Sequence, residues 1–210
     1  MLDYNPKLYI ACCNSQEFLP SDFHWSWENM VKPYDYVKVR FEDTDDKCRN
    51  NQIIKHFLKS NFDVLVKMDI DQKYPPHYFE FMVPLVEKHK VIGPLLYNKW
   101  RSRAYVPLMF EDNLFPYMPT PMTGYSGIVE VPYPHTNLFY AREVLENITP
   151  PWYDKMYNDI GTTRKNDMDF YFLDKIKAQG YKLYINTAVE VEHLVLEGVN
   201  TRLHNRWHRL

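Results

Sequence analysis

The sequence has few of the features that mark secreted, zinc-binding or membrane proteins. Only three of its 210 residues are cysteine. Cys12 and Cys13 are adjacent and Cys48 is remote, so neither a disulfide framework nor the Cys-x-x-Cys spacing of a zinc site is present. There is no run of about eighteen uncharged apolar residues and no apolar leader at the amino terminus. We therefore expect a cytoplasmic protein without membrane contact, in the host cytoplasm if the protein is viral.

The chain also lacks a large excess of charge of either sign. The chain has 25 Lys and Arg against 27 Asp and Glu, which provides no overall field for nucleic acid or an anionic membrane. Hydrophobic residues make up 45% of the 210 residues, enough to bury one substantial core but hardly two. We expect a single domain, residues 1–210, whose partners must be inferred from local sites. The oligomeric state stays open.

The central stretch of the chain runs from Asn61 to Pro76, where an apolar run interrupted only by Lys67 ends in two carboxylates. Its nearly continuous, β-branched character predicts a buried strand. If the chain stays extended, Asp69 and Asp71 point to the same side with Cα atoms roughly 7 Å apart. Such a pair can hold a hard divalent cation and leave positions open for a diphosphate. The alternative is a solvated acidic turn.

Apolar periodicity predicts alternating strands and helices on both sides of this strand. From Tyr97 to Val129 no period holds, and we expect either a packed loop over a site or a flap that only covers core. The predicted strands are Lys7 to Cys13, Tyr34 to Phe41, Val91 to Leu96, one ending at Ile185 and Val189 to Val195; the predicted helices are Lys47 to Ser60, His77 to His89 (kinked or ended by Pro84), the second part of Leu138 to Ile148, and Asp167 to Gly180.

Two further acidic residues and one histidine are candidates for chemistry. Asp167 and Asp169 stand at a predicted helix amino terminus, where backbone N–H groups favour the charged form of a carboxyl group. Helix capping alone is the alternative for both. His193 lies near the end of the last predicted strand, where a structural role is the more common one for a lone histidine.

Five features stand out by their order and spacing: Arg49-Asn50, Asp69-Ile70-Asp71, Pro151-Trp152-Tyr153, the helix that starts at Met168-Asp169, and the late His193. From about Lys7 to His193 they resemble the inverting family 2 glycosyltransferases of GT-A fold, with Asp69-Ile70-Asp71 as the DxD motif and Pro151-Trp152-Tyr153 as the Pro-Trp-aromatic turn. Two departures from the family are Met168-Asp169 in place of Glu-Asp, and His135-Thr136-Asn137 in place of a glycine-containing turn.

The resemblance implies an α/β fold with a Rossmann-like, mixed central sheet flanked by helices. It also implies a nucleotide-binding part at about 1–96 and an acceptor part at about 97–195, followed by a basic tail, 196–210. The implied donor is a nucleoside-diphosphate sugar, most simply a UDP-sugar, with Mn²⁺ or Mg²⁺ as cofactor. The implied reaction is a single in-line displacement that inverts the anomeric carbon.

The resemblance also assigns roles to individual residues. Asp69, Asp71 and His193 would bind the metal ion, and Asp169 or Asp167 would be the general base. The segment from Ala11 to Asn14, which includes Cys13, would form the pocket for the nucleotide base, and Arg49 would contact the nucleotide or its phosphates.

Other functions remain open at this level. The same carboxylates would suit a metal-dependent phosphatase or nuclease, and the fold would also suit a non-catalytic module that binds a nucleotide sugar. The acceptor is expected to be a glycan, a small molecule or a hydroxymethylated base in DNA. The DNA acceptor is suggested by a basic, aromatic terminus with Arg202, Arg206, Trp207 and Arg209.

Overall fold

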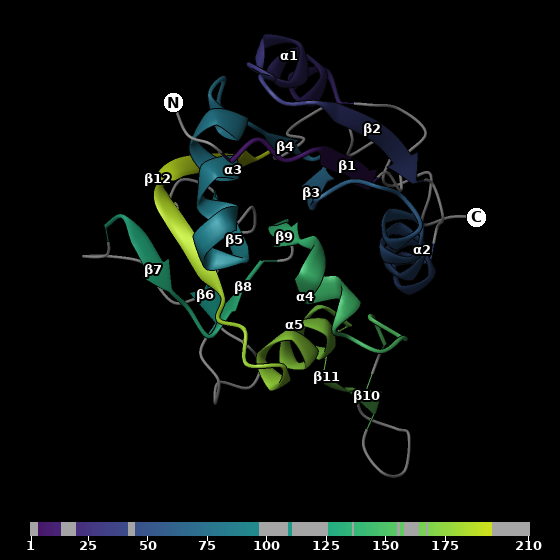
Figure 1. Ribbon diagram of the computed structural model, residues 1–210. Helices are drawn as coiled ribbons and strands as arrows, with labels where there is room; N and C mark the ends of the chain where they lie inside the picture. Colours follow the sequence, from purple (N-terminus) through teal and green to yellow (C-terminus); the bar gives the residue numbers. More distant parts are fainter. Residues whose placement is uncertain are drawn as a thin grey trace, which may run out of the picture.

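The protein is seen in a computed structural model that describes residues 4–13, 20–41, 45–96, 109–110, 126–135, 137–154, 156–157, 164–166 and 168–194. Helices flank a mixed central sheet (Figure 1). The strands are β1 (Leu8–Cys13), β2 (Tyr36–Phe41), β3 (Val64–Asp69), β4 (Gln72–Lys73), β5 (Val91–Leu96), β6 (Met109–Phe110), β7 (Ile128–Glu130), β8 (Tyr133–Pro134), β9 (Phe139–Ala141), β10 (Met156–Tyr157), β11 (Arg164–Asn166) and β12 (Tyr184–His193). The helices are α1 (Ser21–Asn29), α2 (Asp46–Leu58), α3 (Tyr78–His89), α4 (Arg142–Glu146) and α5 (Met168–Ala178).

The central sheet has eight strands in the order β2-β1-β3-β9-β5-β12-β4, with β7 paired to β12. The strands β2, β1 and β3 are parallel, whereas β9 is antiparallel to both of its neighbours, β3 and β5. In the β1–β3 register Ala11 lies opposite Lys67, and Cys13 lies opposite Asp69. Because side chains alternate along a strand, these four residues share one face of the sheet at its carboxyl end.

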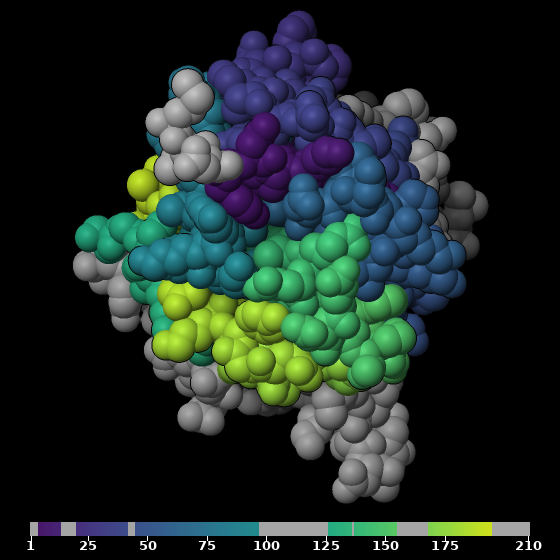
Figure 2. Space-filling model, viewed as in Figure 1, coloured from purple at the N-terminus to yellow at the C-terminus, as the bar shows by residue number. Residues whose placement is uncertain are grey.

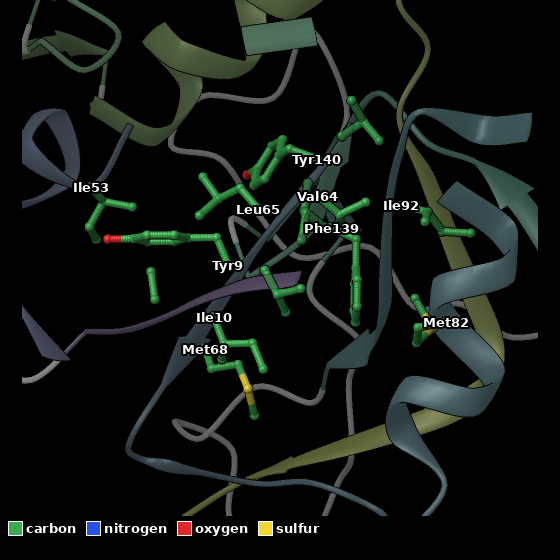
Figure 3. Packing of buried hydrophobic residues seen from close by; sticks show 14 of the residues in the cluster. Tyr9, Ile10, Ile53, Val64, Leu65, Met68, Met82, Ile92, Phe139 and Tyr140 are labelled. Atoms are coloured by element: carbon green, nitrogen blue, oxygen red, sulfur yellow. The ribbon is translucent and has the colours of Figure 1, made fainter. Parts of the chain in front are cut away.

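The two faces of the sheet are covered by different helices. On one face Tyr9 contacts Phe57 of α2, and Tyr140 contacts Phe172 of α5. On the other face Phe139 contacts Phe79 of α3. Figure 3 shows the same division, with the ring of Tyr9 and the side chain of Ile10 pointing away from β1 in opposite directions. In Figure 2 the segments of α2 and α4 adjoin on the surface, which agrees with the contacts between these helices.

Burial on both faces explains why the sequence pattern of β1, β3 and β5 is nearly continuous. All six residues of β1 and of β5 are buried, as are the first five of β3. The prediction of an α/β fold with a mixed, Rossmann-like sheet is therefore confirmed. None of the helices in the described part of the chain is long and apolar enough to cross a lipid bilayer.

Two local predictions differ from the structure, and the prediction for the helix with Pro84 is narrowed to one of its two outcomes. The extended conformation of β3 stops at Asp69, and Asp71 lies in the turn that leads to β4. The prediction that Asp69 and Asp71 point to the same side of an extended strand therefore does not apply. Helix α3 continues through Pro84 to His89 instead of ending at the proline. The two strands predicted near Ile185 and Val189 are one strand, β12, whose pairing with β5 is irregular between Asn186 and Glu190.

Candidate active site

The candidate site lies where β1 and β3 end, the usual ligand position in open α/β sheets. At this edge the structure brings together Cys13 and Asp69, which are opposite one another in the sheet. Asn14, Asp167, most of the segment 97–125 and the tail 196–210 lie outside the described residues, so the predictions on them are not addressed by the structure.

Asp69 is the most firmly held of the predicted metal ligands. Its Oδ2 accepts a 2.8 Å hydrogen bond from Nδ2 of Asn137, and its backbone N–H donates to the hydroxyl of Tyr74 at 3.0 Å. Burial raises the pKa of the Asp69 carboxyl above its ordinary value, although Lys67 and Asn137 both act in the opposite direction. The carboxylate therefore has a fixed orientation before any ligand binds.

Asn137 belongs to the segment that replaces the family's glycine-containing turn, and its sequence context gave no sign of this contact. The backbone N–H of Asn137 donates to Nδ1 of His135 at 3.2 Å, and Nε2 of His135 lies 2.9 Å from the carbonyl oxygen of Pro94. These partners assign the imidazole proton to Nε2. At Gly93 a Cβ atom would lie 2.2 Å from the side chain of Leu138 and 3.2 Å from Cε1 of His135, so a larger residue there would force these side chains to shift.

Acidification should lower the stability of the folded protein because His135 is buried. Burial lowers the pKa of His135 from 6.5 to about 4, and His193 and Lys67 act in the same direction. Between these two pH values the His135 side chain binds a proton in the unfolded chain but not in the folded chain. Neutral His135 therefore makes its full contribution to the free energy of unfolding above about pH 6.5. This contribution, on the order of 3 kcal/mol, is lost as the pH falls toward 4. Urea unfolding at a series of pH values should show a steeper acid decline in the unaltered protein than in His135→Gln. Parallel pH profiles for the two proteins would contradict the assignment.

His193 lies beside the turn that carries Asp71. In the antiparallel pair of β12 and β4, His193 is opposite Gln72, and the backbone N–H of Leu194 donates to the carbonyl oxygen of Asp71 at 2.8 Å. Nε2 of Gln72 lies 3.3 Å from Nε2 of His193, and the hydroxyl of Tyr74 donates to Oε1 of Gln72. Within the described ranges, however, no three His, Cys, Asp or Glu side chains are close enough together to hold one cation.

Asp169 stands in the first turn of α5. Lys67 is only 3% exposed, and the negative charges of Asp169 and Asp69 both act on its ammonium group. Nζ of Lys67 donates a 3.4 Å hydrogen bond to the hydroxyl of Tyr153. Thus the charges of the first carboxylate of the predicted DxD motif and of the predicted general base both act on one buried cation, although the two residues are far apart in the sequence.

The Pro-Trp-aromatic turn that positions Tyr153 is tied to two helices. Oδ1 of Asn51, on α2, accepts hydrogen bonds from the backbone N–H groups of Trp152 and Tyr153, and Nδ2 of Asn51 donates to the carbonyl oxygen of Tyr153. From α5, Lys175 donates to the carbonyl oxygens of Thr149 and Pro151. The sequence marked this turn by family resemblance, but the role of Asn51 became visible only in the fold.

Removing the Asn51 side chain should therefore loosen the turn. We expect Asn51→Ala to lower the free energy of unfolding by about 2 kcal/mol, because backbone groups of the turn lose their partners. Urea unfolding measures the change. The matched control is Asn147→Ala, which removes an exposed hydrogen bond to Tyr181 and should cost much less. Equal losses in the two variants would show that Asn51 has no special role.

The residues predicted to contact the nucleotide lie close to this cluster. Arg49 is buried on α2 and donates to Asp46, one turn earlier on the same helix. Burial raises the pKa of the Cys13 thiol to about 12, while Lys67 and Arg49 oppose this rise, so Cys13 is a neutral thiol near neutral pH. Ala11 is fully buried and lies beside Lys67 in the sheet.

The chain matches no protein-family model and no curated protein sequence. Three-dimensional comparison finds 117 chains of solved structures that match this chain, among them the following three. A197 from STIV is 20% identical with a TM-score of 0.59, covering 90% of this chain and 85% of that one. GalNAc-T7 with UDP, GalNAc and Mn²⁺ is 16% identical with a TM-score of 0.62, covering 93% of this chain and 45% of that one. TarS from S. aureus in complex with UDP-GlcNAc is 14% identical with a TM-score of 0.51, covering 91% of this chain and 59% of that one.

The match therefore spans nearly all of this chain but only about half the length of GalNAc-T7 and of the TarS fragment. At identities of 14–20% such a likeness concerns the fold and not the chemistry. Together with the mixed sheet and its flanking helices, the similarity shows that this chain has the GT-A fold, the fold of the glycosyltransferases that it resembles.

Proposed function

We propose that the protein is a metal-dependent, inverting glycosyltransferase that moves a sugar from a nucleoside-diphosphate sugar to an acceptor hydroxyl group. The proposal rests on the GT-A fold together with two carboxylates, Asp69, which Asn137 holds in place, and Asp169, whose charges both act on the buried ammonium group of Lys67. One carboxylate ends β3, and the other begins α5. A transferase needs both at one place, the first on the donor side and the second on the acceptor side.

The donor types of the proposed ligands suit a divalent cation, although in the described structure the three side chains are not gathered closely enough to hold one cation. Asp69 and Asp71 offer carboxylate oxygens, and His193 offers an imidazole on the strand paired with β4. These three residues would hold Mn²⁺ or Mg²⁺. When bound, the cation would neutralise negative charge on the diphosphate leaving group. Asn137 would keep Asp69 in the orientation that the site requires.

Asp169 would act as the general base that takes the proton of the acceptor hydroxyl. The oxygen of that hydroxyl then forms the new bond to the anomeric carbon as the bond to the diphosphate breaks, in one step and with inversion. Asp167 remains the alternative base.

The donor would be a UDP-sugar bound by the first part of the chain, about 1–96. Ala11, Cys13 and Asn14 would line the pocket for the base, and Arg49 would contact the nucleotide or its phosphates. Two of the compared structures were solved with UDP or UDP-GlcNAc, which supports this choice of donor. The buried free thiols of Cys12 and Cys13 agree with a cytoplasmic location.

For the acceptor, bound by about 97–195, we propose a glycan, a small molecule or a hydroxymethylated base in DNA. Labelled sugar should be offered with each of these acceptors at several salt concentrations. Contact with DNA phosphates would weaken steeply with salt, and removal of the last nine residues, 202–210, should flatten that dependence.

The test of the proposed function is a screen of nucleotide sugars for nucleotide release, with and without Mn²⁺ and Mg²⁺. Transfer should require a divalent cation, and the product should have the inverted anomeric configuration. Retention of configuration would contradict the single displacement. Hydrolysis of phosphate esters or nucleic acid without sugar transfer would favour the phosphatase or nuclease, and binding of UDP-sugars without turnover would favour a non-catalytic module.

A further inference from the structure

Gln72 is a buried polar residue in the antiparallel pair formed by β4 and β12. It is only 1% exposed, and it lies opposite His193 in the register of the two strands. The backbone N–H of Leu194 donates to the carbonyl oxygen of Asp71 at 2.8 Å, which holds the two backbones together at this point. The side chains of Gln72 and His193 are therefore neighbours because of the sheet itself.

The Gln72 amide group lies between two partners. On one side the hydroxyl of Tyr74 donates to Oε1 at 2.9 Å, and on the other side Nε2 lies 3.3 Å from Nε2 of His193. Tyr74 is also buried. Its hydroxyl oxygen accepts from the backbone N–H of Asp69 at 3.0 Å and lies 3.2 Å from the carbonyl oxygen of the same residue. These contacts form one chain of polar groups from the end of β3 to His193.

This chain of contacts determines which nitrogen of the His193 ring carries the proton. The NH₂ group of an amide can only donate, so Nε2 of His193 accepts, and the proton of the neutral imidazole is on Nδ1. A neutral imidazole has one ring nitrogen with a lone pair to share, and here that lone pair is directed at Gln72. In this arrangement His193 has no lone pair to give to a cation, in agreement with the lack of a gathered set of cation ligands among the described residues.

A half-turn of the Gln72 amide would reverse these roles and leave the other heavy atoms in place. Oε1 would accept from Nε2–H of His193, and Nε2 of Gln72 would donate to the hydroxyl oxygen of Tyr74. The single hydroxyl proton of Tyr74 would then turn to the carbonyl oxygen of Asp69, which is already within reach at 3.2 Å. The Gln72 amide and the Tyr74 hydroxyl remain hydrogen-bonded in both states, but in the second state the lone pair of His193 is on Nδ1.

We propose that Gln72 is a positioning residue that selects the tautomer of His193. With its amide nitrogen toward the ring, Gln72 keeps the imidazole from binding a cation; with its amide oxygen toward the ring, it presents the Nδ1 lone pair to a divalent cation. The inference rests on the proposed function, because that function gives His193 the task of binding the cation. A histidine that binds a metal ion usually donates its other ring N–H to an oxygen acceptor, and Oε1 of Gln72 is such an acceptor.

The experiment is ¹⁵N NMR of the His193 ring in the full chain at about pH 8.5, where imidazole groups are generally neutral. Ring nitrogens with and without a proton give well-separated signals, and His193→Gln assigns them. In the metal-free protein we expect the proton on Nδ1. After addition of MgCl₂ and UDP, which avoid the paramagnetism of Mn²⁺, we expect the proton on Nε2.

Gln72→Glu tests the part played by the amide. A carboxylate can only accept, so the proton of His193 should be on Nε2 whether or not Mg²⁺ is present. The matched control is Gln179→Glu, which makes the same change at an exposed position just after α5 and should leave the proton on Nδ1 in the metal-free protein. If Gln72→Glu fails to fold, Gln72→Met removes both ends of the amide, and the metal-free protein should then lose its preference for the proton on Nδ1.

The outcomes separate this inference from the proposed function. A proton on Nε2 in the metal-free, unaltered protein overturns the inference, as does a metal-free tautomer that is the same in the unaltered protein and the Gln72 variants. A tautomer that stays unchanged with MgCl₂ and UDP also overturns it, even if sugar transfer is found. A tautomer that depends on Gln72 and changes with MgCl₂ and UDP, in a protein that transfers no sugar, would support the inference and contradict the proposed function.

Discussion

Asp169→Asn is expected to slow sugar transfer by roughly a hundredfold or more, the usual scale for loss of a general base. The asparagine keeps the size of the side chain at the start of α5 but cannot take a proton from the acceptor. Because Asp169 is not part of the proposed donor site, affinity for the nucleotide sugar should stay nearly unchanged. Initial rates of transfer and calorimetric titration with the donor measure the two quantities separately.

Two other substitutions on or next to this helix provide the controls. Asp174→Asn changes an aspartate further along α5 that accepts a hydrogen bond from Tyr133, and it should leave the rate of the transfer step largely intact. Asp167→Asn should have a milder effect than Asp169→Asn. If Asp167→Asn proved to be the inactive variant, the base would be Asp167, and the alignment with the family would be wrong by two residues.

Asp71→Asn is expected to abolish the dependence of donor binding on Mn²⁺, because an amide provides no negative charge to offset the cation. We expect donor affinity in the presence of Mn²⁺ to fall at least about tenfold, as for other losses at metal sites. Asp69→Asn should have a weaker effect, since Oδ2 of Asp69 is already committed to Asn137. Calorimetric titration with UDP-sugars, with and without Mn²⁺, measures both variants.

The matched control for the metal site is Asp63→Asn, just before β3, where the carboxylate accepts a hydrogen bond from the backbone N–H of Lys7. This variant should bind the donor with unchanged metal dependence. An Asp71 variant that binds UDP-sugars as tightly as before in Mn²⁺ would exclude Asp71 as a ligand.

The sequence by itself determined the elements whose information is local. The nearly continuous apolar run of β3, the helical spacing of Ile53, Ile54 and Phe57 in α2, and the acidic start of α5 each predicted the correct type of structure. Such patterns are readable because a buried strand or an amphipathic helix needs its apolar residues at fixed intervals along its own chain. Their alternation agreed with the α/β fold that the family resemblance implied, and the Asp69-Ile70-Asp71 motif indicated which edge of the sheet to inspect.

The tertiary structure alone decided which side chains meet at that edge. Asn137 contacts Asp69 because β9 is inserted between β3 and β5, and Tyr153 reaches Lys67 because Asn51 and Lys175 tie its turn to two helices. The partners in these contacts are 68 and 86 residues apart in the chain. No periodic pattern in the sequence predicts these contacts, because the free energy that favours each of them arises only after the sheet has brought the two segments together.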